Sequence, residues 1–202
     1  MKLATFCADG ATALGLVNEE GVVDLTRRIT DLPGDMSALI EQWPTFAERV
    51  AALCDAPADH PLAAVQLLAP IARPGKVLGI GLNYGEHLTE AAGVGFKSTG
   101  KQMWFFKPAT ALAGPYADVE RPLVSGALDY EAELVFIVGR RCRHLSVDEA
   151  AQAIFGYCAG NDLSVRDWQT HTSQVTLGKS FDTHAPLGPW IVTADEIGDP
   201  QG

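Results

Sequence analysis

Two acidic residues in the stretch DYEAEL, residues 129–134, have the type and spacing best suited to chemistry. On a β-strand, side chains two positions apart point to the same face, so Glu131 and Glu133 would project together, with Asp129 on the same side. Carboxylates held this close repel each other unless a cation or a proton neutralises them. The spacing therefore indicates either a cation site or the solvent-facing stripe of an antiparallel strand.

A third carboxylate, Asp162, stands in the polar stretch NDLSVRD, residues 161–167, directly after the apolar, small-residue stretch 154–160. Three carboxylates completed by water suit a hard, octahedral cation, which favours Mg²⁺ or Mn²⁺ over Zn²⁺. Taken alone, Asp162 is equally consistent with a turn or helix N-cap residue.

His87 and Glu90, in GLNYGEHLTE (81–90), lie three positions apart and would be neighbours on a helical turn. A carboxylate beside an imidazole raises its basicity and fixes its tautomer, as a general base requires. Surface His–Glu pairs have the same spacing, so the alternative of a simple surface pair stays open. The glycines around this stretch do not match the dinucleotide-binding pattern G-x-G-x-x-G.

Lys179, in GKSFDT (178–183), could donate a hydrogen bond to an oxyanion or a carboxylate. The alternative is an ordinary surface lysine, the usual position of this residue type. The tripeptide GKS resembles the end of a phosphate-binding loop, but Ser173 stands where that motif needs a glycine. The sequence therefore does not support a nucleotide site here.

Composition restricts the partners and the setting of these residues. The formal net charge is −10, which would repel phosphate backbones and excludes nucleic acid as an expected partner. No apolar run approaches the roughly 20 residues that span a bilayer, and no signal-peptide pattern precedes the first strand. The four cysteines form no C-x-x-C pair and are expected to be reduced thiols. We therefore expect a cytoplasmic protein with no membrane partner.

Residues 1–70 are predicted to form a small N-terminal domain of a β-hairpin and helices. A strand is expected at 2–7, a hairpin from 14–17 and 22–25, and helices at 36–42 and 46–53. Thr45 and Glu48 fit a capping box behind Pro44. The stretch 56–76 carries four prolines and is predicted to be a linker.

Residues 71–202 are predicted to form a strand-rich catalytic domain. Strands are expected at 77–82, 103–107, 130–138 and 190–193, the second of them buried because it is apolar and aromatic. A turn or short helix is expected at 84–91. Ser146 and Glu149 fit a capping box, with the helix continuing over 150–157. Without regular βαβ alternation, the expected fold class is α+β and not a doubly wound sheet.

Five ordered motifs between about residue 76 and residue 199 resemble the fumarylacetoacetate hydrolase family. They are GIGLNYGEHLTE, FFKPATALAGP, DYEAELVFIVG, GYCAGNDLSVRDWQ and GKSFDTHAPLGPWIVTADEI. The N-terminal unit is similar to the small leading domain of many bacterial members. The resemblance implies a mixed β-roll or barrel with flanking helices, assembled as a homodimer.

The resemblance also assigns roles to residues. It implies that Glu131, Glu133 and Asp162 bind the metal, which we expect to be Mg²⁺, with Mn²⁺ and Ca²⁺ as alternatives. It implies that His87 with Glu90 activates water or moves a proton.

The same resemblance places Lys179 on an oxygen of a bound 2-oxo acid, and Arg166 and Gln169 near the substrate. The expected function is Mg²⁺-dependent hydrolysis of a C–C bond in a 2-oxo or diketo acid, of the acylpyruvate or fumarylpyruvate type. Decarboxylation and isomerisation of 2-oxo acids from aromatic catabolism pass through the same metal-stabilised enolate and stay open as alternatives. So does a non-catalytic metal-binding homologue. Hydrolysis is favoured because a His–Glu pair could activate water.

Members of this family continue beyond the point where the sequence ends, at GDPQG. We therefore expect residues 71–202 to be an incomplete copy of the catalytic fold, and the isolated chain to be unstable, because strands would lose packing partners.

Overall fold

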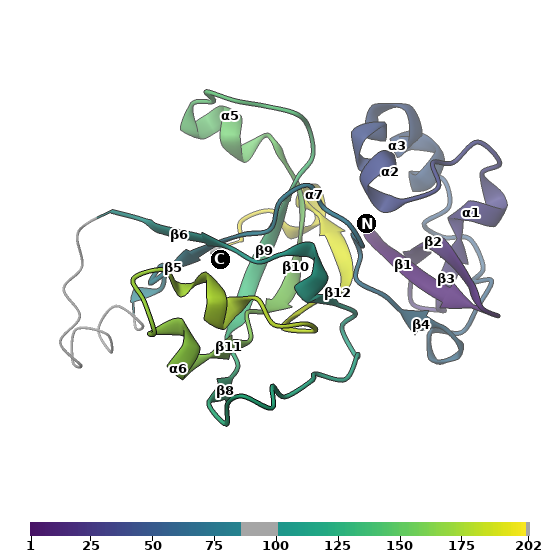
Figure 1. Cartoon of the computed structure of the whole chain (residues 1–202). Coiled ribbons are helices and arrows are strands. Elements are labelled where there is room, and N and C mark those ends of the chain that lie inside the picture. The colour runs from purple at the N-terminus through teal and green to yellow at the C-terminus, as the bar shows by residue number, and fades with distance from the viewer. Residues whose placement is uncertain (86–100, 201–202) are drawn as a thin grey trace.

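A computed structural model of the chain describes residues 1–85 and 101–200, and its largest element is an eight-stranded sheet (Figure 1). The strands run in the order β3-β2-β1-β12-β10-β9, with β4 paired to β1 and β7 paired to β12. Their bounds are Lys2–Ala8 for β1, Ala11–Val17 for β2, Val22–Asp24 for β3, Gln66–Leu67 for β4, Leu112–Ala113 for β7, Ala132–Val138 for β9, Ile154–Asn161 for β10 and Ala185–Thr193 for β12.

The N-terminal strands form an antiparallel meander that matches the predicted strand and hairpin. β1 and β2 are joined at Asp9-Gly10, where φ is 50° and 78°. Positive φ at both central residues gives the turn whose twist suits a two-residue hairpin, and Asp-Gly adopts it readily. The second turn, at 18–21, leads into β3 as expected.

Three helices cover this meander: α1 at Leu25–Arg28, α2 at Met36–Glu41 and α3 at Trp43–Ala51. The last two confirm the predicted helices, but the predicted capping box at Thr45 is wrong. α3 begins three residues earlier than predicted, at Trp43, without a side-chain cap and with a proline in its first turn. Proline is favoured there because its missing N–H would be unpaired in any case. Apolar side chains of the sheet and helices form the main core: Leu3, Leu14, Leu16, Val23, Leu25, Ile29, Met36, Leu39, Ile40, Phe46, Val50 and Ile191.

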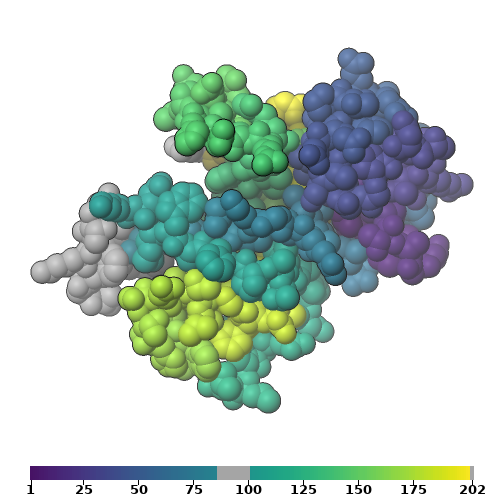
Figure 2. Space-filling view, turned by 45° about the horizontal axis from the view of Figure 1, so that its top comes forward, coloured from purple at the N-terminus to yellow at the C-terminus, as the bar shows by residue number. Residues whose placement is uncertain are grey.

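The sheet is continuous between the N-terminal strands and the rest of the chain. β1 pairs antiparallel with β12, where Lys2 lies opposite Val192 and Leu3 opposite Ile191. The proline-rich stretch 56–76, which was predicted to be a linker, contains a 3₁₀ turn at Leu62–Ala64 and then β4. In the space-filling view the N-terminal elements gather on one side of the molecule and residues 164–180 on the other (Figure 2). The division near residue 70 stays a prediction.

A separate two-stranded ribbon consists of β5, Leu78–Gly81, and β6, Met103–Phe106. Both strands were predicted, but the expectation that 103–107 is buried is wrong. Trp104 and Phe106 are 52% and 57% exposed, while Phe105 between them is buried. A two-stranded ribbon can bury only one face, so alternate side chains face outward. Most of the turn or helix predicted at 84–91 lies outside the described residues.

The predicted capping box at Ser146 is confirmed, and α5 spans Val147–Ala151. The continuation of this helix over 150–157 is wrong, because β10 begins at Ile154 and pairs with β9. Ile154, Phe155 and Tyr157 are strand-forming residues, and the pairing with β9 outweighs the high helical propensity of the alanines before them. An N-terminal capping box marks where a helix begins and not where it ends.

Short elements complete the chain and stand close to the acidic residues. β8, Leu128–Asp129, pairs with β11, Ser164–Val165, and α6 follows at Arg166–Gln169. The remaining elements are 3₁₀ turns at Ala109–Ala111 and Val175–Lys179 (η3), and α7 at Ala194–Ile197. The predicted strand-rich α+β class is confirmed. The described strands form an open sheet from β3 to β9, not a closed barrel. No helix within 1–85 or 101–200 has the length and apolarity to cross a bilayer.

Candidate metal centre

Antiparallel pairing of β9 and β10 brings the acidic residues together. The register sets Gly160 opposite Glu133 and Asn161 opposite Ala132. Asp162, just after β10, therefore lies beside Glu131, just before β9. The Asp162 amide donates to the Glu131 carbonyl at 2.8 Å. Two segments that are far apart in sequence thus meet at one end of the sheet.

The predicted strand over 130–138 is interrupted at Tyr130 and Glu131, between β8 and β9. The Glu131 amide leaves the ladder and donates instead to the Asn161 side-chain oxygen at 3.1 Å. Even so, Glu131, Glu133 and Asp162 each offer an oxygen, and these oxygens all lie within 4.8 Å of one another. The structure therefore brings the three predicted ligands into one cluster.

Lys179 lies inside this cluster and is 2% exposed, not a surface lysine. Its Nζ donates to Glu131 Oε2 at 2.9 Å and to Asp162 Oδ2 at 2.6 Å. η3 can approach α6 because Gly178 has no Cβ. A Cβ at this position would lie only 2.4 Å from the Gln169 backbone nitrogen. Only glycine permits that contact.

A second lysine, Lys107, reaches the same carboxylate from the end of β6. Its Nζ donates to Asp162 Oδ1 at 2.6 Å and to the Leu163 carbonyl at 3.1 Å. Both oxygens of Asp162 are therefore bonded to ammonium groups. Burial lowers the pKa of Lys107, and the nearby Asp162 carboxylate partly opposes that shift.

Arg166 and Gln169, predicted to lie near the substrate, stand at the edge of the cluster on α6. The Arg166 guanidinium donates through Nε and Nη2 to Asp129 Oδ2, at 2.9 and 2.7 Å, and it also bonds to Glu131 Oε1. Gln169 accepts from Arg166 at 3.1 Å. Arg166 thus links the outer carboxylate, Asp129, to the inner one.

Glu133 has a different environment from its two partners. The phenol of Tyr84 donates to Glu133 Oε2 at 3.0 Å and accepts from the Leu134 amide at 3.4 Å. Burial raises the pKa of Glu133, and the negative charge of Asp162 adds to the effect. For Glu131, burial acts in the same direction, but hydrogen bonds from Lys179 and Arg166 outweigh it and lower the pKa.

The charge balance of the cluster fits a divalent cation. Lys107, Arg166 and Lys179 face four carboxylates, the triad and Asp129, which leaves one net negative charge. The donors are all carboxylate oxygens, the ligands that Mg²⁺, Mn²⁺ and Ca²⁺ prefer. The three carboxylates could hold such an ion, with water completing its coordination.

The predicted base, His87, and its partner Glu90 lie outside the described residues, so their placement stays a prediction. The residue nearest to them in sequence with a described contact to the cluster is Tyr84, through Glu133.

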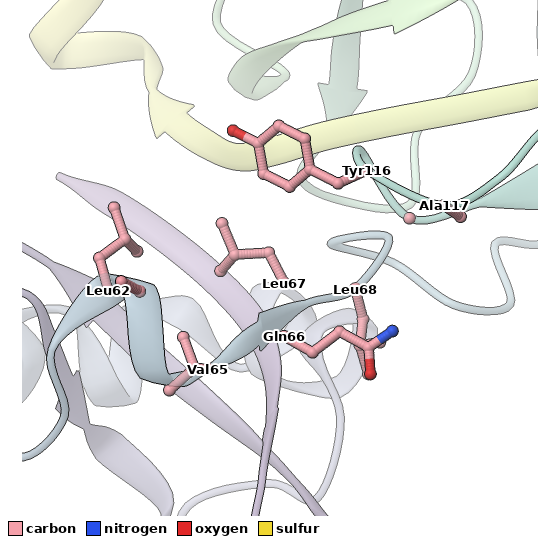
Figure 3. Close-up of a pocket in the computed structure, with 9 residues that line it drawn as sticks. Leu62, Val65, Gln66, Leu67, Leu68, Tyr116 and Ala117 are labelled. Atoms are coloured by element: carbon pink, nitrogen blue, oxygen red, sulfur yellow. The ribbon is translucent and has the colours of Figure 1, made fainter.

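An apolar groove of about 710 Å³ lies elsewhere, between residues 62–68 and the segment after β7. Tyr116 lies opposite Leu62 and Leu67 there (Figure 3). No Asp, Glu, His, Lys or Arg lines it, so it lacks the charged groups that the acidic cluster has.

Sequence reasoning did not identify Lys107 or Tyr84 as members of the site. Lys107 stands between an aromatic run and a proline, FFKP, where an isolated charge at the end of an apolar strand was the available signal. Tyr84 sits in GLNYGEH, three residues before the predicted base.

Together, the strand-rich α+β fold and a partly buried acidic triad beside buried lysines define a class of proteins able to bind a divalent metal. The model of the fumarylacetoacetate (FAA) hydrolase C-terminal family matches residues 76–202, and the chain belongs to this family.

Relatives and solved structures agree. The chain is 34% identical, over 98% of its length, to a fumarylacetoacetate hydrolase domain-containing protein 2 homolog of Dictyostelium discoideum and covers 66% of that protein. Maleylpyruvate hydrolase from Sphingobium sp. SYK-6, solved with manganese(II) and pyruvate, is 32% identical with a TM-score of 0.80. The match covers 99% of this chain and 70% of that one.

A third match is 5-carboxymethyl-2-hydroxymuconate delta-isomerase from Mycobacterium smegmatis, which is 30% identical with a TM-score of 0.69. That match covers 96% of this chain and 67% of the isomerase. The chain thus spans about two thirds of the length of these proteins.

Proposed function

We propose that the protein is a Mg²⁺-dependent hydrolase that cleaves a C–C bond in a 2-oxo or diketo acid of the acylpyruvate or fumarylpyruvate type. The observation that carries the proposal is the triad Glu131, Glu133 and Asp162, whose oxygens lie within 4.8 Å of one another beside a buried lysine. The Sphingobium structure, which holds manganese(II) and pyruvate, supports both a divalent metal and a 2-oxo acid ligand. Mn²⁺ and Ca²⁺ are the alternative ions.

A divalent ion bound by the triad would supply Lewis acidity toward the 2-oxo group of the substrate. The protein's own groups would orient the substrate and move the proton. Lys179 stands within reach of the cluster and would donate to a substrate oxygen. Arg166, held by Asp129, would lie beside the substrate carboxylate. His87 with Glu90, as predicted from the sequence, would take the proton from the attacking water.

Isomerisation is the second candidate, because the chain is also similar to a delta-isomerase. Moving a double bond in a 2-oxo acid needs the same ion and the same base, but no attacking water. Decarboxylation would likewise use the triad and Lys179. The proposal favours hydrolysis because of the predicted His–Glu pair. The homodimer and the cytoplasmic location inferred from the sequence remain part of the same proposal.

The deciding experiment combines a substrate panel with a metal panel. Purified protein is incubated with acylpyruvates, oxaloacetate and 2-hydroxy-dienedioates, in Mg²⁺, Mn²⁺ or EDTA, and the products are identified by NMR. We expect pyruvate from an acylpyruvate, only when the metal is present. The matched control is Glu131→Gln, which keeps the shape of the side chain but removes its charge. Double-bond migration without cleavage would replace hydrolysis by isomerisation.

A further inference from the structure

Lys107 is a buried lysine to which the proposed reaction assigns no part. It is 7% exposed and directly follows β6, the second strand of the two-stranded ribbon. Burying an ammonium group is costly unless it is paired and hydrogen-bonded. Here it has two acceptors, Asp162 Oδ1 at 2.6 Å and the Leu163 carbonyl at 3.1 Å. Such a group needs a reason beyond stability.

Lys179 provides the comparison, because it binds the same carboxylate from the other side. Lys179 bridges Asp162 Oδ2 and Glu131 Oε2, so it stands between two members of the triad, where a metal would also have to bind. Lys107 binds Asp162 Oδ1 and a backbone carbonyl. The Lys179 ammonium therefore lies between two predicted ligands, whereas the Lys107 ammonium binds only one of them, Asp162.

Gripping one oxygen restricts the rotation of a carboxylate. With Oδ1 bonded to Lys107, Asp162 presents Oδ2 toward Glu131, as the shared contact with Lys179 shows. The backbone of Lys107 is itself held in place, because its amide donates to the Val77 carbonyl at 3.1 Å across the ribbon. Fixed ligand orientation is what such supporting hydrogen bonds contribute at metal sites.

We propose that Lys107 is a positioning residue that orients Asp162 for the divalent ion and thereby raises the metal affinity of the site. The inference rests on the proposed function, because it requires the triad to bind a divalent ion. It goes beyond it in giving the two lysines opposite effects. Lys107 supports metal binding, and Lys179 competes with the metal for Asp162.

The test is a calorimetric titration with Mn²⁺ alone, on the wild-type protein and on Lys107→Met, Lys107→Arg and Lys179→Met. Loss of positive charge by itself would strengthen Mn²⁺ binding in both methionine variants. A positioning role for Lys107 predicts instead that the Mn²⁺ affinity changes in opposite directions in the two variants. We expect Lys107→Met to bind Mn²⁺ at least about tenfold more weakly, within the range known for supporting residues. Lys179→Met should bind it several-fold more tightly, and Lys107→Arg should regain most of the loss.

The core variant Leu39→Ala distinguishes a positioning role of Lys107 from a general loss of stability. Leu39 lies on α2, far from the triad in the sequence. The variant should lower stability without changing the Mn²⁺ affinity. Mn²⁺ binding by folded Lys107→Met that equals or exceeds wild type would overturn the inference while leaving the proposed function intact. A wild-type protein that binds no Mn²⁺ would overturn both.

If Lys107→Met does not fold, amide hydrogen exchange of the wild-type protein decides the matter. Mn²⁺ should slow exchange in β6, because fixing Asp162 also fixes the lysine that holds it. Unchanged exchange in β6 on Mn²⁺ binding would overturn the inference.

Discussion

The N-terminal region, residues 1–70, and the site region, residues 101–200, bury different kinds of side chain. The buried residues of the N-terminal region are apolar with the exception of Thr5, and they form two clusters over the meander. The site region buries far more polar groups among its described residues: Lys107, Asp162, Ser164, Lys179, His184 and Thr193.

This difference separates the part of the molecule that stabilises the fold from the part that prepares a site. Burying apolar area contributes roughly 25 cal/mol per Å². Buried ion pairs contribute little net stability, because desolvation offsets the attraction between the charges. The cluster around Asp162 is therefore poorly explained by stability alone. Three cations face four carboxylates there, and the one net negative charge that is left suits a divalent ion.

The largest effect is expected from Asp162→Asn, which tests the site region directly. This change removes a proposed metal ligand and leaves Lys107 with neutral acceptors only. We expect Mg²⁺-dependent turnover and Mg²⁺ binding to fall below detection. Breaking a buried ion pair should also cost about 3–5 kcal/mol of stability. Calorimetry and urea unfolding measure the two effects, and undiminished Mg²⁺ affinity would remove Asp162 from the ligand set.

The next effect concerns the base predicted from the sequence. His87→Ala should slow turnover by roughly 10²–10⁴-fold, the usual contribution of a general base. Mg²⁺ affinity should stay close to wild type, because the imidazole is not a predicted ligand. Glu90→Gln should show a smaller loss of the same kind. Steady-state kinetics beside a metal titration checks both, and wild-type turnover in His87→Ala would assign the base to another residue.

Leu39→Ala tests the N-terminal side of the comparison. Leu39 is fully buried on α2 within the main cluster. Removing its side chain should destabilise the protein by about 2–5 kcal/mol, through lost burial and a residual cavity. Turnover and metal affinity, measured where the variant is folded, should be unchanged. A change in metal affinity would show that the two regions are coupled, and the contrast between them would fail.

The N-terminal region was also the easier part to predict from the sequence. The strands β1 to β3, the hairpin at 18–21 and two of its three helices follow from local patterns of apolar and turn residues, whereas α1 and β4 were not predicted. Errors arose where tertiary pairing decided the outcome. Residues 154–157 join β10 because β9 lies beside them, and Trp104 is exposed because its ribbon has one free face. The pairing of β10 with β9 and of β6 with β5 joins residues that are distant in sequence, so a short stretch of sequence does not reveal it.

The site was predictable where the spacing itself carried the chemistry. Glu131 and Glu133 were recognised as a pair, although Glu131 lies before β9 and not within it. Lys107 was missed because its partner, Asp162, is 55 residues away in sequence. The isolated charge at the end of an apolar strand was the available local signal, but it does not by itself identify the partner or the burial of the lysine. The roles of His87 and Glu90 rest on their spacing and on the family resemblance, those of Arg166 and Gln169 on the resemblance, and all four stay predictions.

The smallest effect is expected from the ion pair between Arg28 and Asp59 in the N-terminal region, which can be compared with the ion pairs of the site region. Asp59 accepts hydrogen bonds from Arg28 Nε at 2.8 Å and from the Asp24 amide at 2.8 Å. The Arg28 hydrogen bond lowers the pKa of Asp59 below its ordinary value of 3.8. A lowered carboxyl pKa means that the stabilisation is present above pH 3.8 and is lost as the pH falls through the lower, folded-state pKa.

Asp59→Asn should therefore cost at most about 1 kcal/mol at pH 7, because Arg28 is partly exposed and water screens the pair. The difference from wild type should vanish in urea unfolding near or below the folded-state pKa. Asp31→Asn is the matched control, since its partner Arg49 lies 44% exposed and the pair should contribute nothing measurable. Metal affinity should not change in either variant. A cost at pH 7 as large as that of Asp162→Asn would mean that buried charge is not peculiar to the site region.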